Sequence, residues 1–173
     1  NGKVIQSNGV LSIAQPGAAS GMPQTSLCAR KYENANLSGI ISFEADLMFP
    51  NLQIGQVRIG LVNNIGSAGC LHHYSYNINE YFSVFHCDYF SSTRHWVPNV
   101  KDVKPGTWHS ARIELDTSTG KLIYYLDGQK NYTYDTGSEL SQTGYWFVLT
   151  IMAESKNNVI GYIDNVRIRR IEK

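Results

Sequence analysis

Residues 106–129 read GTWHSARIELDTSTGKLIYYLDGQ, and this stretch decides the fold of the chain. Alternate residues are suited to a buried face, namely His109, Ala111, Ile113 and Leu115 in the first half and Leu122, Tyr124 and Leu126 in the second. A period of two is typical of strands with one buried face. Thr117–Gly120 supplies a turn between the halves, and Asp127-Gly128 marks a second corner. A lone hairpin is unstable in water, so a second sheet has to cover its apolar face, and we predict a β-sandwich.

The same alternation recurs along the chain, and no stretch keeps a helical apolar period beyond two turns. The residues between the predicted strands are rich in turn formers, among them the loop expected over 15–24. The predicted strands are 10–13, 26–32, 39–49, 56–62, a hairpin over 70–90 that turns at Ile78-Asn79, the hairpin described above, 145–153 and 160–171. The pattern predicts an all-β protein with two antiparallel sheets, and one domain over residues 1–173.

Bulk composition excludes several classes of partner. The 173 residues are 42% hydrophobic and 17% charged, with a formal net charge of +1. The near-neutral charge gives no electrostatic basis for binding nucleic acid. The longest apolar run, 145–153, is too short to span a bilayer as a helix, so we expect no membrane insertion.

Three cysteines, Cys28, Cys70 and Cys87, leave at least one without a partner in the chain. A turn at Ile78-Asn79 would place Cys70 opposite Cys87, where either a disulfide or two buried thiols would fit. In that register His72 and His86 lie on opposite faces of the hairpin. The expectation is therefore that they do not share a tetrahedral metal ion.

Two motifs together resemble the concanavalin A-like lectin/glucanase superfamily, which includes laminin-G-like, pentraxin-like and family-16-glycosidase-like jelly rolls. One is the hairpin that opens with Trp108-His109 and ends with the Tyr-x-x-Asp-Gly pattern of residues 124–128, YYLDG. The other is the terminal segment GYIDNVRI, residues 161–168. The resemblance implies a jelly roll with one concave sheet, and ligands on the concave face or on the rim loops. Such motifs indicate a fold more than a function.

Catalysis of the family-16 kind needs two carboxylates about 5–5.5 Å apart, on alternate positions of a strand. The corresponding stretch here, residues 81–89, carries one acid, Asp88. Glu44 and Asp46 have the right spacing but lie too early in the chain. With Arg58 on the expected neighbouring strand they are interpreted as a surface charge ladder. We therefore predict no catalytic residues, while a polysaccharide hydrolase or lyase with an unrecognised site stays open.

Calcium is the candidate cofactor. Asp164 and Asn165 offer oxygen ligands where the alternation of the terminal strand breaks, and the resemblance implies a structural calcium site near such an Asp. One carboxylate and one amide supply too few of the 6–8 oxygens that calcium takes. The alternative is that Asp164 hydrogen-bonds a neighbouring loop.

Aromatic residues carry the functional prediction. Residues 89–96, YFSSTRHW, are expected to form a loop in which Tyr89, Arg94 and Trp96 offer a stacking ring and hydrogen-bond donors for a sugar. Tyr76 and Trp146 extend this set if they reach the concave face. The alternative is that the two tryptophans only cover the end and edge of the sandwich.

The sequence thus predicts a non-catalytic carbohydrate-binding module whose partner is a glycan or polysaccharide. We expect it to be extracellular or on the cell surface, as part of a larger protein. A laminin-G-like structural or protein-interaction domain is the alternative from another class.

Overall fold

Strands account for the regular structure of the chain in a computed structural model. The structure describes residues 3–15, 24–32, 39–48, 50, 55–62, 71–77, 81–88, 93–102, 105–135, 145–153 and 158–171, and within these ranges it has thirteen strands and no helix. The strands are β1 (Lys3–Ser7), β2 (Val10–Gln15), β3 (Gln24–Tyr32), β4 (Ile40–Met48), β5 (Gly55–Val62), β6 (Leu71–Asn77), β7 (Tyr81–Asp88), β8 (Thr93–Asp102), β9 (His109–Asp116), β10 (Lys121–Leu126), β11 (Gln129–Asp135), β12 (Tyr145–Ala153) and β13 (Val159–Ile171). The prediction of an all-β fold is confirmed.

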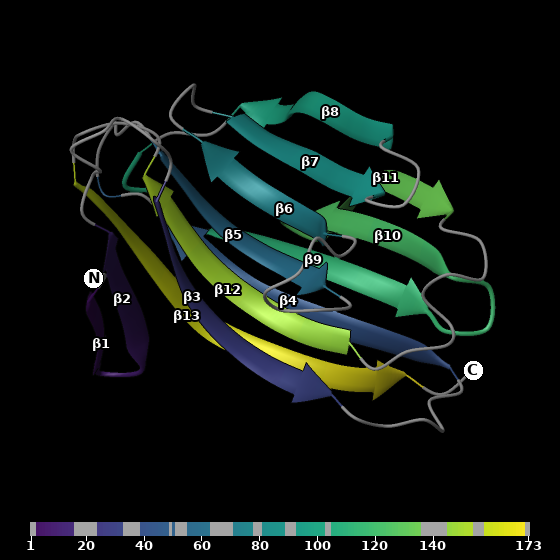
Figure 1. Cartoon of the computed structure of the whole chain (residues 1–173), viewed down its shortest axis with the longest axis horizontal. Coiled ribbons are helices and arrows are strands. Elements are labelled where there is room, and N and C mark those ends of the chain that lie inside the picture. The colour runs from purple at the N-terminus through teal and green to yellow at the C-terminus, as the bar shows by residue number, and fades with distance from the viewer. Residues whose placement is uncertain are drawn as a thin grey trace.

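Two antiparallel sheets are stacked face to face (Figure 1). The seven-stranded sheet has the order β1-β2-β13-β4-β9-β10-β11, and the six-stranded sheet has the order β3-β12-β5-β6-β7-β8. Strands distant in sequence are neighbours in both, such as β4 with β9 and β3 with β12. No helix in the described ranges is long and apolar enough to cross a membrane.

The central hairpin forms as predicted. His109, Ala111, Ile113 and Leu115 of β9 are buried, as are Leu122, Tyr124 and Leu126 of β10. Gly120 closes the turn with a φ of 71°, and Asp127 and Gly128 take φ values of 49° and 78° at the next corner. Positive φ at two successive residues is the signature of the tight hairpin turn that Asp-Gly favours.

The core lies between the two sheets and is built from alternate residues of the central strands. Phe43 of β4 meets Phe147 of β12 edge to face across the interface, with ring centroids 5.0 Å apart. Val57 and Ile59 of β5 complete the six-stranded side, and both are fully buried. Tyr132 and Tyr134 of β11 pack against the same cluster.

Residues 93–102 form a strand where the sequence predicted a loop up to Trp96. β8 is the last strand of its sheet, and its register against β7 shifts between Phe82 and Val84. Pro98 lies in the part of β8 that this shift leaves out of register, between Val97 and Lys101. Because proline has no backbone N–H to donate, it is tolerated on edge strands and at bulges. The prediction of a loop over residues 89–96 is therefore wrong for residues 93–96.

The hairpin of β6 and β7 has a register one residue away from the prediction. Leu71, and not Cys70, lies opposite Cys87, and His72 lies opposite His86. Cys70 and the turn residues Ile78 and Asn79 fall outside the described residues. A shift of one residue exchanges the faces of a strand, so the expectation that His72 and His86 lie on opposite faces is wrong.

The predicted partner of the acidic strand is also different. Arg58 belongs to β5 of the six-stranded sheet, whereas Glu44 lies in the seven-stranded sheet between Arg112 of β9 and Arg167 of β13. The charge ladder exists, but its cations come from β9 and β13. Sequence proximity favoured β5, but β4 and β5 belong to different sheets.

Candidate functional site

Four of the five residues predicted to bind sugar belong to the six-stranded sheet. Arg94 and Trp96 lie on β8, Tyr76 on β6 and Trp146 on β12. Tyr89 falls outside the described residues. The strand pairing decides which of the four share a face, because directly paired residues of an antiparallel sheet lie on the same face and alternate residues on opposite faces.

Trp146 and Arg94 are the two ends of one continuous row across five strands. Trp146 pairs with Val62, Val62 with Leu71, Leu71 with Cys87, and Cys87 with Arg94. Four strand spacings separate the ends, which is about 19 Å. On the other side of Trp146 the row continues to Lys31 of β3.

Trp96 belongs to the neighbouring row on the same face. It pairs with Phe85, which pairs with His73, and His73 pairs with Gly60. Phe147 and Leu149, which alternate with Trp146 along β12, are core residues. The rows of Trp96, Arg94 and Trp146 therefore belong to the face of the sheet that is turned away from the other sheet. We call this the outer face of the six-stranded sheet.

Tyr76 is separated from these three by its register. It pairs with Val57, which is fully buried in the core. Tyr76 therefore holds a position on the core side of the sheet, although sequence alternation alone could not assign it to a side. The roles of Tyr76 and Tyr89 in binding stay predictions.

Acidic residues are rare on the six strands. β7 and β8 each contribute one, Asp88 and Asp102, and β3, β5, β6 and β12 contribute none. Asp102 pairs with Tyr81, the first residue of β7, and Asp88 is the last residue of β7. Seven residues at ~3.4 Å each put these positions about 24 Å apart. The two positions are too far apart for a retaining pair of carboxylates, which needs about 5–5.5 Å.

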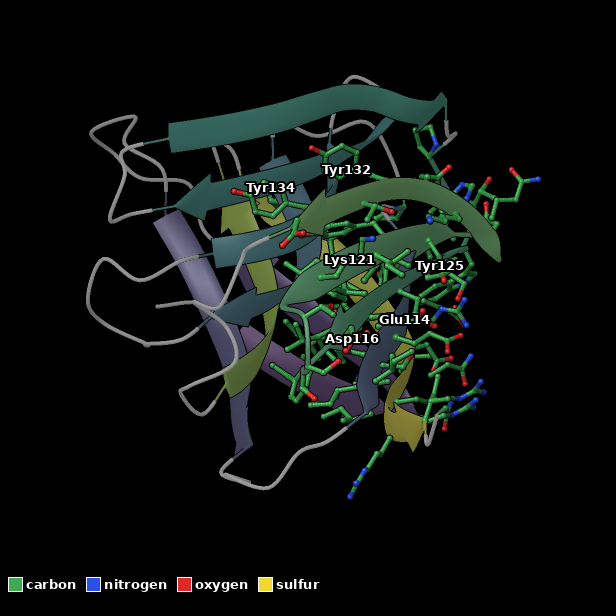
Figure 2. All side chains as sticks on the ribbon, turned by 90° about the vertical axis from the view of Figure 1, so that its right-hand side faces the viewer. Glu114, Asp116, Lys121, Tyr125, Tyr132 and Tyr134 are labelled. Carbon is green, nitrogen blue, oxygen red and sulfur yellow. The ribbon has the colours of Figure 1, made fainter. Side chains whose placement is uncertain are left out.

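The outer side of the seven-stranded sheet carries a polar cluster that the sequence did not single out. The guanidinium of Arg112 lies 4.0 Å from the centre of the Tyr125 ring, and its Nε lies 3.4 Å from Oε1 of Glu114. Figure 2 shows Glu114 and Tyr125 on this outer side, while Tyr132 and Tyr134 lie on the side of the core. Burial, followed by the hydrogen bond and the negative charge of Glu114, raises the pKa of Tyr125 above its usual 10.0, against a lowering by Arg112. The pairing of Tyr125 with Arg112 followed from the hairpin register, which was predictable.

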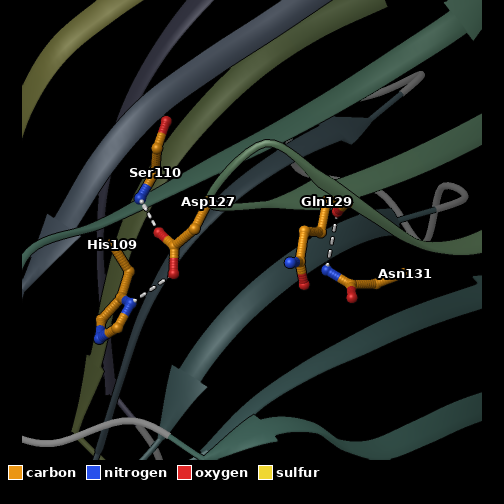
Figure 3. Close-up of polar contacts among 5 residues, drawn as sticks. All are labelled: His109, Ser110, Asp127, Gln129 and Asn131. Carbon is orange, nitrogen blue, oxygen red and sulfur yellow. Dashed lines mark hydrogen bonds and ion pairs between the residues drawn. The ribbon is translucent and has the colours of Figure 1, made fainter.

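A second polar cluster fastens the corner between β10 and β11 to the start of β9. The carboxylate of Asp127 accepts hydrogen bonds from the backbone N–H of Ser110 at 3.0 Å and contacts Nδ1 of His109 at 3.0 Å (Figure 3). The backbone N–H of Asp127 donates to the carbonyl of Ser110 at 2.8 Å. The same figure shows the side-chain amide of Asn131 donating to the carbonyl of Gln129. A buried histidine held by a carboxylate orders this corner.

The predicted metal ligands lie at a bulge in β13. The register of β13 against β4 shifts between Asp164 and Arg167, and Asn165 has a φ of 49°. The backbone N–H of Asn165 donates to Asp164 Oδ1 at 2.6 Å, and its side-chain amide donates to Asp46 Oδ2 at 2.7 Å. Both contacts place N–H donors against carboxylate oxygens that calcium would need. The donor to Asp164 is the backbone N–H of the next residue, so this bond does not show the expected contact with a neighbouring loop, and calcium binding itself remains a prediction.

The residues with described side chains contain no group of three or more His, Cys, Asp or Glu arranged for a metal ion. Asp46, which the sequence placed in a charge ladder, lies opposite Asp164 in the pairing of β13 with β4 and accepts a hydrogen bond from Asn165. A strand pairing of residues 118 positions apart gives no local signal, so this contact could not be predicted.

No protein-family model matches the sequence, and no curated protein is similar to it in sequence. Many solved structures are similar in fold. A sialidase superposes with a TM-score of 0.72 at 13% identity, over 99% of this chain and 16% of the sialidase chain. An endo-β-1,4-glucuronan lyase from the fungus Trichoderma reesei gives 0.66 at 12% identity, over 98% of this chain and 87% of the lyase. The carbohydrate recognition domain of Emp46p gives 0.63 at 10% identity, over 95% and 85% of the two chains. The chain thus spans less than a fifth of the sialidase and most of the other two, and it has the concanavalin A-like jelly-roll fold.

Proposed function

We propose that this chain is a carbohydrate-binding domain that holds a glycan on the outer face of its six-stranded sheet. The observation that carries the proposal is the continuous row from Trp146 to Arg94, with Trp96 on the same face. The positions of Trp146 and Arg94 are about 19 Å apart, and Trp96 lies on the same sheet face. Two tryptophans and a cation arranged in this way suit a chain of sugar units that lies across the strands. A carbohydrate recognition domain and a polysaccharide lyase of the same fold support a glycan as ligand.

The charge of this face favours an anionic glycan. Lys31 lies in the row of Trp146 and Arg94, and Arg58 lies on the same face, paired with Thr150 and Ser75. Against these three cations the strand residues of this face include one acid, Asp102, at its far end. Carboxylate or sulfate groups on a polysaccharide would thus meet an excess of positive charge.

The binding role is proposed to be non-catalytic. The two acidic residues of the six strands lie about 24 Å apart, which supports binding without hydrolysis by a carboxylate pair. A lyase is the second candidate, because His73 lies in the row of Trp96 and the glucuronan lyase has the same fold. We further propose that the chain acts outside the cell or on its surface, where polysaccharides are met.

Binding of a panel of neutral and uronate-containing polysaccharides to the purified chain tests the proposal. Trp96→Ala and Trp146→Ala are each expected to weaken binding at least about tenfold, since loss of a large aromatic anchor typically costs more than 1.4 kcal/mol. Trp108→Ala is the matched control, because Trp108 is 40% exposed and precedes β9 of the other sheet. Circular dichroism verifies that each variant is folded.

Three outcomes separate the candidates. Equal loss of binding in Trp96→Ala and Trp108→Ala would refute the assignment of the face. Release of unsaturated oligosaccharides from a uronate polymer, abolished in His73→Ala, would establish the lyase. A protein ligand retained in all tryptophan variants, without any glycan signal, would establish the laminin-G-like alternative.

A further inference from the structure

Three of the five histidines occupy consecutive positions of one row. His72 of β6 pairs with His86 of β7, and His86 pairs with His95 of β8. This row could not be predicted from the sequence, because the expected register of the β6–β7 hairpin put His72 and His86 on opposite faces. The register of the structure brings all three to one face of the sheet.

This row lies on the opposite face from the proposed glycan site. His95 and Trp96 are successive residues of β8, and successive residues of a strand belong to opposite faces. At its other end the row reaches Leu61 of β5, which pairs with His72 and lies two residues from the buried Ile59. The histidine row therefore belongs to the core side, near the edge of the six-stranded sheet that ends with β8.

The chemistry of the row points to a transition metal. Directly paired positions have Cβ atoms about 4.5–5.5 Å apart, so the central strand lies within reach of both neighbours. Zinc binds imidazole nitrogens at about 2.0–2.1 Å and is often held by three histidines with one position left for another donor. The row contains no carboxylate, which disfavours calcium and magnesium.

We propose that His72, His86 and His95 bind one divalent transition-metal ion, for which zinc is the first candidate. The ion ties β6, β7 and β8 together on the core side of the sheet. This site is independent of the glycan-binding proposal, because it uses the other face of the same strands.

The test is a titration of the metal-free full-length chain with Zn²⁺ and with Co²⁺, whose visible absorption reports its ligands. One equivalent is expected to bind, and His86→Gln is expected to weaken zinc binding by about 100-fold or more, since even partners of metal ligands typically cost 10–100-fold. His73→Gln is the matched control, because His73 is the next residue of β6 and lies on the opposite face. Cys87→Ser controls for the thiol next to His86. Neither control is expected to change the affinity.

A second measurement on the unaltered chain decides the matter if His86→Gln fails to fold. Long-range ¹⁵N–¹H spectra resolve the imidazoles, and zinc is expected to shift three of the five while the signals of His73 and His109 stay in place. The absence of saturable zinc binding, a loss of affinity in His73→Gln equal to that in His86→Gln, or a zinc-induced shift of His73 in place of the three would overturn the proposal. Glycan binding by the metal-free chain is expected to persist, so the two proposals fail separately.

Discussion

Single residues at the β10–β11 corner combine two roles, and Asp127 shows both. Its φ of 49° is a conformation that Asp and Asn tolerate better than other residues with a Cβ, and its carboxylate also holds Ser110 and His109. We expect Asp127→Ala to lower the free energy of unfolding by about 2–3 kcal/mol, because it loses charged hydrogen bonds and the favoured turn residue. Asp127→Asn keeps the conformational preference and is expected to cost about half as much. Urea denaturation measures both, and Gln129→Ala, an exposed neighbour, serves as the control. Equal losses of stability in the two Asp127 variants would contradict a contribution from the left-handed preference of Asp and Asn.

Tyr125, on the outer side of the seven-stranded sheet, is expected to make the stability of the fold depend on pH in the alkaline range. Its pKa in the folded chain is raised by burial and by Glu114, so the unfolded chain ionises first as the pH rises. The stability that Tyr125 contributes is complete below a pH of about 10 and is lost as the pH rises through its folded pKa. Tyr125→Phe is therefore expected to lose less stability between neutral pH and pH 11 than the unaltered chain. Unfolding by urea at each pH measures this, and an identical pH dependence in both proteins would contradict it.

At the scale of single elements, the hairpin of β9 and β10 was predictable and the position of β8 was not. Residues 106–129 carry their strands, turn and face pattern within one local window, and the structure confirms each. β8 contains Pro98, and only its place at the sheet edge beside a register shift makes that proline acceptable. The register of β6 and β7 depends on the turn between them, and an error of one residue put His72 and His86 on opposite faces when they share one. Local sequence patterns thus predict single strands. Which residues lie side by side across a sheet can be known only once the pairing of the strands is known.

The bulge in β13 allows a direct test of the predicted calcium site. Asn165 has positive φ and donates to Asp46 and Asp164. We expect Asn165→Ala to lower the free energy of unfolding by about 1–2 kcal/mol and Asn165→Gly to cost less, because glycine keeps the left-handed conformation. Both measurements are made with EGTA and again with calcium, and an unfolding midpoint that calcium leaves unchanged would contradict the predicted calcium site. A rise in the unfolding midpoint with calcium that disappears in Asp164→Asn would instead establish the metal.

At the scale of the whole molecule, the two sheets are held together by the rings of Phe43 and Phe147. Phe43 is 1% exposed and meets Phe147 edge to face across the core. We expect Phe43→Ala to lower the free energy of unfolding by about 3–5 kcal/mol, because it opens a cavity between the sheets. Val166→Ala on β13 is the control, since Val166 is 44% exposed and a surface change typically costs at most about 0.5 kcal/mol. A loss below about 1 kcal/mol in Phe43→Ala would mean that the sheets collapse to fill the space.

The two sheets also differ in what their outer sides offer to a polyanion. Two cations of the seven-stranded sheet face acids of the same sheet: Arg112 contacts Glu114, and Arg167 pairs in register with Glu44. On the outer face of the six-stranded sheet Lys31, Arg58 and Arg94 have one acid among them, and that acid is at the far end.

Binding of a uronate polymer is therefore expected to weaken as salt rises, because added ions screen charges over about 10 Å at 0.1 M. Arg94→Gln should weaken binding and flatten this salt dependence, whereas Arg169→Gln, exposed on the other sheet, should do neither. Affinity electrophoresis over a salt series measures both effects. Salt-independent binding, or the same flattening in Arg169→Gln, would mean that a neutral glycan is held by the rings of Trp96 and Trp146 alone.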